Sequence, residues 1–125
     1  MPNDSVLDVG CGWGRLAYLL PTTWRGDYLG IDITPEFLSI TQQNHPDLDF
    51  AQCDVSNVSQ FMEEYKQRSH VESEKWNWAV CVSIKGMVCN NLTETAWDYM
   101  LTEMKAVAER VLVLEYDEND KGEIL

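Results

Sequence analysis

Basic residues are scarce in this chain of 125 residues, which carries 9 Lys and Arg against 21 Asp and Glu and a formal net charge of −12. Such a charge repels phosphate backbones, so no nucleic-acid substrate is expected. Long apolar runs are also missing, which excludes a membrane span and the layout of a signal peptide. A small molecule, a protein or a cation is the more suitable partner, and no membrane association is expected.

Cysteine is sparse as well, with Cys11, Cys53, Cys81 and Cys89 too far apart in sequence for a zinc pattern. No metal site is therefore expected, and a reduced cytoplasmic setting is the default. A chain of this length forms one domain, here residues 1–125, and buries roughly 65% of its unfolded surface without the help of disulfides.

Strand-like and helix-like segments alternate five times, with no repeat or linker between them. The expected strands are Ser5–Val9, Asp27–Ile31, Asp49–Cys53, Trp76–Ile84 and Val111–Tyr116. Helices are expected between them, starting near Trp13, Pro35, Val58 and Asn91, with the last in helical phase to Ala108. This alternation predicts an α/β fold, a doubly wound and mostly parallel five-stranded sheet with helices on both faces.

Three alternating glycines, Gly10, Gly12 and Gly14, lie in the turn between the first strand and its helix. Glycines at this place allow positive φ and let a ligand lie against backbone N–H groups. The dinucleotide fingerprint would need its third glycine at Arg15, and the lysine of a triphosphate loop is absent. This disfavours a nicotinamide or flavin oxidoreductase, while a purely structural turn remains an alternative for the glycines alone.

Acidic residues follow two further strands, Asp32 after the second and Asp54 after the third. Ligands of such sheets bind at the carboxyl ends of the strands. The Asp32 carboxylate has acceptors for both hydroxyls of a ribose, and Asp54 is suited to the exocyclic amine of an adenine, with Cys53 and Val55 against the ring. Either acid alone fits a helix cap or a solvated turn, but together with the glycines they predict a nucleoside site.

The run Asp8-Val9-Gly10-Cys11-Gly12-Trp13-Gly14 resembles the first motif of the class I S-adenosylmethionine-dependent methyltransferases, and the resemblance covers residues 5–116. It implies the strand order 3-2-1-4-5, S-adenosylmethionine as cofactor and no metal. The cofactor-binding residues it implies are Asp8, Gly10, Cys11 and Gly12 at the turn and the methionine portion, Asp32 and Ile33 at the ribose, Asp54 and Val55 at the adenine, and Ser83 after strand four. Arg15 and Trp13 remain open between cofactor contacts and ordinary helix positions.

Catalytic residues are harder to name, because methyl transfer depends on positioning and a dry pocket more than on a dedicated side chain. Lys85 is the candidate, to steer an anionic acceptor or orient a hydroxyl, with a solvated loop lysine as the alternative. Ser83-Ile84-Lys85-Gly86 replaces the Asn/Asp-Pro-Pro-aromatic motif of the nucleic-acid methylating families. The predicted function is a small-molecule or protein methyltransferase, and the alternative is a non-catalytic S-adenosylmethionine-binding module that acts as a sensor or partner subunit.

Members of the family usually have a lid before the first strand and two strands beyond the fifth. This chain begins four residues before Ser5 and ends nine residues after Tyr116, so it resembles a minimal core. The apolar run Val111–Leu114 is then expected to present an open edge, which predicts a homodimer whose partner supplies the lid. Acidic residues after this run oppose such pairing.

Overall fold

The computed structural model describes residues 4–12, 14–20, 26–68, 75–82, 94–114 and 123–125. Five of its strands run parallel, namely β1 (Val6–Val9), β2 (Tyr28–Asp32), β3 (Asp49–Gln52), β4 (Trp76–Val82) and β5 (Ala108–Leu114). They lie side by side in the order β3-β2-β1-β4-β5. The predicted α/β class, parallel pairing and strand order are confirmed.

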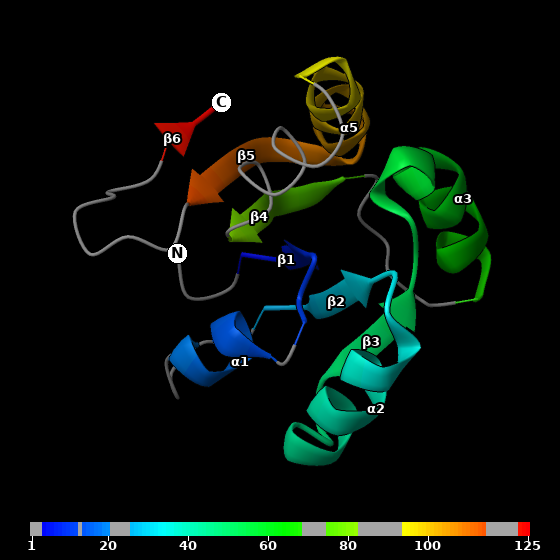
Figure 1. Ribbon diagram of the computed structural model, residues 1–125, viewed down its shortest axis with the longest axis vertical. Helices are drawn as coiled ribbons and strands as arrows, with labels where there is room; N and C mark the ends of the chain where they lie inside the picture. The colour runs from blue at the N-terminus through cyan, green and yellow to red at the C-terminus, as the bar shows by residue number, and fades with distance from the viewer. Residues whose placement is uncertain (1–3, 13, 21–25, 69–74, 83–93, 115–122) are drawn as a thin grey trace.

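A sixth strand, β6 (Glu123–Ile124), pairs antiparallel with Leu112 and Val113 of β5, beside which Figure 1 shows it. The N–H of Leu125 also donates to the carbonyl oxygen of Val111 at 2.8 Å. The sheet therefore extends one short strand beyond the five that were expected. The apolar run Val111–Leu114 was expected to present an open edge. Part of that edge is paired, because Leu112 and Val113 pair with Ile124 and Glu123.

Helices cover both faces of the sheet. On one side lie α1 (Arg15–Leu19) and α2 (Pro35–Asn44), and on the other lie the 3₁₀ turn η1 (Val55–Asn57), α3 (Val58–Arg68) and α5 (Glu94–Val107) (Figure 1). This two-sided cover is what right-handed crossovers between parallel strands produce. None of the helices in the described part has the length and apolar character that crossing a bilayer requires.

Local chemistry explains where α2 begins but not where β5 begins. Pro35 occupies the first turn of α2 after the N-cap Thr34, as expected, although the Thr34 side chain makes no capping hydrogen bond. By contrast, β5 starts at Ala108, three residues before the predicted start, and directly follows α5. Val107 and Ala108 are both buried, so the chain passes from helix to strand without an exposed loop.

Two apolar clusters flank the sheet. The larger lies on the α3 and α5 side and includes Leu7, Val9, Leu29, Ile31, Met62, Trp97 and Met104. The smaller lies on the α1 and α2 side and includes Val6, Ala17, Tyr28 and Val80. Side chains alternate along a strand, so Asp8 of β1 shares the face of Val6 and points toward the smaller cluster.

Candidate functional site

A cavity of about 310 Å³ opens where β1, β2 and β3 end. Its wall combines the glycine turn with two acids and several apolar side chains. The lining residues are Gly10, Gly12, Asp32, Ile33, Thr34, Phe37, Cys53, Asp54, Val55 and Met100. Phe37 comes from α2 and Met100 from α5, so both helical layers contribute to a site at the carboxyl ends of the strands.

The glycine turn depends on positive φ angles, with Gly10 at 71°, Gly12 at 52° and Gly14 at 85°. The N–H groups of Gly10 and Cys11 both donate to the carbonyl oxygen of Ile31, at 2.8 and 2.9 Å. These bonds hold the turn against the end of β2. The backbone can therefore line the cavity without side chains between it and a ligand.

Asp32, the last residue of β2, links the glycine turn to the start of α2. Its Oδ2 accepts the N–H of Gly12 at 2.9 Å, and its Oδ1 accepts the N–H of Thr34 at 2.9 Å. A carboxylate has acceptor capacity for about four hydrogen bonds, so each oxygen retains a lone pair for a ligand. The group is thus held in place before any ligand binds, and it keeps two acceptors on the cavity wall.

Asp54 lies two residues beyond the end of β3 and also lines the cavity. Its Oδ1 accepts two hydrogen bonds from Ser56, one from the N–H at 3.0 Å and one from the hydroxyl at 2.8 Å. The N–H of Asn57 donates to the Asp54 carbonyl oxygen at 2.9 Å. The N–H of Cys53 donates to the carbonyl oxygen of Asp32 at 3.1 Å, which ties this turn to the end of β2.

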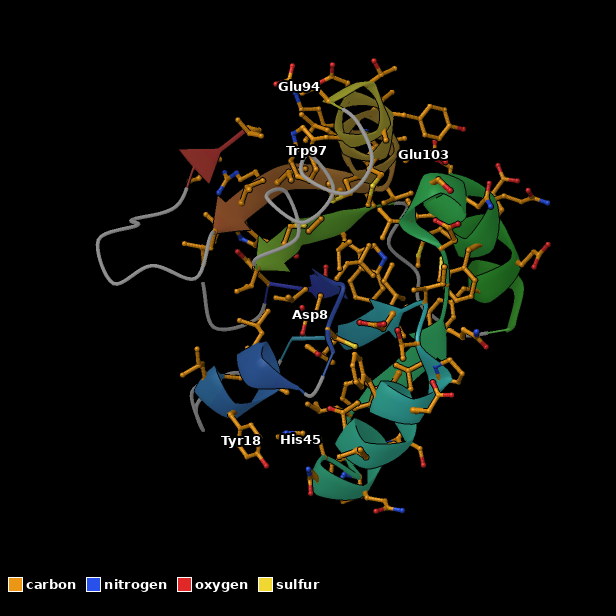
Figure 2. The ribbon with its side chains drawn as sticks, viewed as in Figure 1. Asp8, Tyr18, His45, Glu94, Trp97 and Glu103 are labelled. Atoms are coloured by element: carbon orange, nitrogen blue, oxygen red, sulfur yellow. The ribbon has the colours of Figure 1, made fainter. Side chains whose placement is uncertain are left out.

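Asp8 is buried at 2% exposure, and Figure 2 shows it near the centre of the sheet. The hydroxyl of Tyr28 donates to its Oδ2 at 2.6 Å. Gly30 lies opposite Asp8 in the strand register, and a Cβ there would lie 2.9 Å from the Tyr28 hydroxyl and 2.6 Å from the Phe50 ring. Because Gly30 has no side chain, the Tyr28 side chain has the space to pass it and to reach from β2 to Asp8 on β1.

Burial sets the ionisation of Asp8. It raises the pKa of this carboxyl from 3.8 to about 7; the Tyr28 hydrogen bond lowers the pKa and the charge of Asp32 raises it further. Burial also raises the pKa of the Tyr28 hydroxyl, and the charge of Asp8 raises it further. The proton in this hydrogen bond therefore stays on the tyrosine.

The thiols near the site are unreactive for the same reason. Burial, followed by the charges of Asp8 and Asp32, raises the pKa of Cys11 to about 12. Burial and the charge of Asp54 raise the pKa of Cys53 to about 11. Because the thiolate is the nucleophile, neither cysteine acts as one at neutral pH.

Two polar side chains, those of Thr41 and His45, lie next to Gly14 of the glycine turn. The Thr41 hydroxyl, on a fully buried residue, and Nε2 of His45 have no hydrogen-bond partner in the described part of the chain. A Cβ at Gly14 would lie 2.3 Å from the Thr41 hydroxyl and 3.2 Å from His45 Nε2. The ring of His45 also meets that of Tyr18 edge-on at 4.5 Å between centroids, as Figure 2 shows between α1 and α2. His45 therefore packs between α1 and α2.

The cavity brings together six of the cofactor-binding residues that the resemblance implies, namely Gly10, Gly12, Asp32, Ile33, Asp54 and Val55. Cys53, which was expected against the adenine ring, lines it too. Asp8 and Cys11 are buried and are not among its lining residues. Ser83 and Lys85, together with Trp13 and the side chain of Arg15, lie outside the residues that the structure describes.

Three lining residues were not predicted as part of the site, namely Thr34, Phe37 and Met100. Helical phase places Phe37 and Met100 on inward faces, but phase alone does not tell which inward residue reaches the cavity. Tyr28, the partner of Asp8, was missed too. Its signal is Gly30 inside a strand, which marks a close approach of another group.

Comparison with known sequences identifies the family. Residues 6–110 match the family described as methyltransferase domain. A putative methyltransferase, 235L, of Invertebrate iridescent virus 6 is 30% identical over 56 residues, 44% of this chain and 21% of the viral protein. The ribosomal protein L11 methyltransferase of Cupriavidus taiwanensis is 39% identical over 54 residues, 40% of this chain and 18% of that enzyme. The matched part is thus about a fifth of the length of these curated relatives.

Solved structures show the same fold. Magnesium protoporphyrin IX methyltransferase from Synechocystis, with bound SAH, has a TM-score of 0.64 and 20% identity over 90% of this chain and 46% of that one. A TehB-like SAM-dependent methyltransferase from Corynebacterium glutamicum has a TM-score of 0.61 and 22% identity over 89% of this chain and 54% of that one. The chain spans about half the length of these structures. The match over residues 6–110 shows that the chain belongs to the family of methyltransferase domains, and these structures show that it has the fold of S-adenosylmethionine-dependent methyltransferases.

Proposed function

We propose that this chain binds S-adenosylmethionine and transfers its methyl group to a small-molecule acceptor. The observation that carries the proposal is the position of Asp32 on the cavity wall, where the N–H groups of Gly12 and Thr34 hold its two oxygens. The remaining lone pairs match the two hydroxyls of a ribose. A cavity of about 310 Å³ is within the usual range for small ligands.

The other walls fit the remaining parts of the cofactor. Ile33 stays with Asp32 at the ribose. Apolar side chains at Phe37, Val55 and Met100 suit the faces of an adenine ring, beside which Asp54 offers an acceptor for the exocyclic amine. The methionine portion is assigned to the glycine turn, from Asp8 through Gly10 and Cys11 to Gly12. The floor of the cofactor site is assigned to Ser83.

When bound, the cofactor supplies a sulfonium methyl group, which passes to a lone pair of the acceptor while the electrons of the carbon–sulfur bond return to sulfur. The chain contributes by binding, orienting and excluding water. The raised pKa values of Cys11 and Cys53 favour direct transfer over a route through an enzyme thiolate. Lys85 is proposed to orient the acceptor.

Asp32→Ala is expected to weaken the binding of S-adenosylmethionine roughly ten- to a hundredfold, because hydrogen bonds to a charged group are lost. Calorimetry with the purified chain measures this, and thermal unfolding checks that the variant remains folded. Asp47→Ala is the matched control, since it removes an exposed carboxylate that does not line the cavity. Unchanged affinity in Asp32→Ala would remove this residue from the site.

Catalysis is tested with radiolabelled S-adenosylmethionine and a metabolite extract, with the Asp32→Ala variant as the negative control. Label in a small molecule supports the proposed enzyme. Binding of the cofactor without any transfer identifies a non-catalytic binding module instead. If the chain binds no S-adenosylmethionine at millimolar concentration, the proposal fails altogether.

Duplex DNA and structured RNA are not expected as acceptors, because a net charge of −12 opposes a polyanion. Fluorescence anisotropy at physiological salt should give dissociation constants weaker than about 10⁻⁴ M, the weak end of non-specific binding. Methylation of nucleic acid by the isolated chain would contradict this. The free thiols of Cys11 and Cys53 support the proposed cytoplasmic setting, where thiols stay reduced.

The homodimer was predicted to form at the Val111–Leu114 edge. Because β6 pairs with part of that edge, we propose that the homodimer forms through β6 instead. In the described part β6 is the outermost strand of the sheet, and Ile124 on it is 63% exposed. Two copies of β6 can pair across a two-fold axis, because an isologous contact uses the same edge twice. Light scattering after size exclusion should give a dimer mass for the native chain and a lower mass for Ile124→Glu. A monomer mass for the native chain contradicts this prediction.

A further inference from the structure

The Asp54 carboxylate uses its two oxygens differently. Oδ1 accepts both hydrogen bonds from Ser56, the N–H at 3.0 Å and the hydroxyl at 2.8 Å. Oδ2 makes no hydrogen bond to any residue in the described part of the chain. An ionised carboxylate only accepts hydrogen bonds, so Asp54 keeps one oxygen for a donor on a ligand.

Ser56 is itself well placed to hold Asp54. Its neighbour Val55 is 8% exposed and belongs to the larger apolar cluster. The N–H of Asn57 donates to the Asp54 carbonyl oxygen at 2.9 Å, which closes the turn around Ser56. Rotation of the Asp54 side chain would break both Ser56 bonds, so this turn restricts the carboxylate to one orientation.

Resting on the function proposed above, we propose that Ser56 is a positioning residue, which fixes Asp54 so that the cavity accepts a 6-aminopurine and rejects a 6-oxopurine. The exocyclic amine donates to Oδ2, whereas a 6-oxo group turns lone pairs toward it. A free carboxylate can rotate to meet the N1–H of the 6-oxopurine instead. Ser56 prevents that adjustment.

The test compares the affinities of S-adenosylhomocysteine and its 6-oxo analogue, S-inosylhomocysteine, by calorimetry. The native chain should prefer the adenosyl compound at least roughly tenfold. Ser56→Ala should weaken binding of the adenosyl compound roughly three- to tenfold and leave binding of the inosyl compound unchanged or tighter. The preference for the adenosyl compound then falls. Asp54→Ala should abolish the preference.

The double variant Ser56→Ala/Asp54→Ala should match Asp54→Ala alone, because Ser56 acts through Asp54. Ser59→Ala is the matched control, since its hydroxyl also donates to a carboxylate, that of Glu103 at 2.7 Å, but neither residue lines the cavity. It should leave both affinities unchanged.

Equal weakening of both compounds by Ser56→Ala, or additive losses in the double variant, would overturn the positioning role. These outcomes differ from failure of the proposed function, in which the native chain binds neither compound. Thermal unfolding of each variant separates a lost fold from a lost preference.

Discussion

Asp8→Asn is expected to stabilise the protein at pH 8 by up to about 4 kcal/mol and to have almost no effect on stability near pH 4. The side chain is 2% exposed, and burial raises its pKa from 3.8 to about 7. Asparagine has nearly the same shape and carries no charge, and its amide oxygen can still accept the hydrogen bond from Tyr28.

The sign follows from the protons bound by each state. Between pH 3.8 and about 7 the folded state retains a proton on Asp8 that the unfolded chain has released. The free energy of unfolding of the native chain therefore falls as pH rises through this window, and the full penalty is present above it. The Asp8→Asn variant has no carboxyl proton at this position, so its free energy of unfolding does not fall in this way as pH rises.

Urea denaturation of the native chain and of Asp8→Asn at pH 4, 6 and 8 measures the effect. Asp27→Asn is the control, because it removes one exposed carboxylate just before β2. A gain in stability that is equal at pH 4 and pH 8 would show that Asp8 does not titrate in this window.

The same variant informs the assignment of Asp8 to the methionine portion of the cofactor. A buried carboxylate that destabilises the fold at neutral pH is typical of groups kept for binding or catalysis. Asp8→Asn is then expected to bind S-adenosylmethionine more weakly although the protein is more stable. Unchanged affinity would limit the role of Asp8 to its contact with Tyr28.

Gly14→Ala is expected to destabilise the fold by about 3 kcal/mol, more than the same change at Gly12. Both glycines have positive φ, 85° at Gly14 and 52° at Gly12, so either alanine adopts a left-handed conformation at a cost of about 1 kcal/mol. Only at Gly14 would the new Cβ also overlap a buried group, since it would lie 2.3 Å from the Thr41 hydroxyl. At Gly12 the nearest atom, the Gly10 carbonyl oxygen, is 4.0 Å away.

Thermal or urea unfolding of the two variants separates the cost of the left-handed backbone from the cost of the overlap with Thr41. Gly12→Ala serves as the matched control, because it has the first cost without the second. Adding Thr41→Ala to Gly14→Ala should recover part of the lost stability, because it removes the nearest overlapping atom. Equal losses at the two glycines would mean that α2 shifts to make room. Gly12→Ala, on the cavity wall, should instead weaken cofactor binding with little loss of stability.

Local sequence patterns determined most of the fold and the three strand ends that line the cavity. Alternating strand-like and helix-like segments predicted five parallel strands, which the structure confirms. Residues at or just beyond the carboxyl ends of β1, β2 and β3 were predicted as ligand contacts, because parallel strands bring these ends to one edge of the sheet. Gly12, Asp32 and Asp54 on the cavity wall are positions of this kind.

Tertiary structure alone decided which side chains meet. Asp8 and Tyr28 lie 20 residues apart, and only the register that sets Asp8 opposite Gly30 brings them within hydrogen-bond distance. Met100 reaches the cavity from α5, about 90 residues after Gly10, because that helix packs against η1. Periodicity reports which way a residue faces within its own strand or helix, but contacts between elements depend on register and packing, which no single segment encodes.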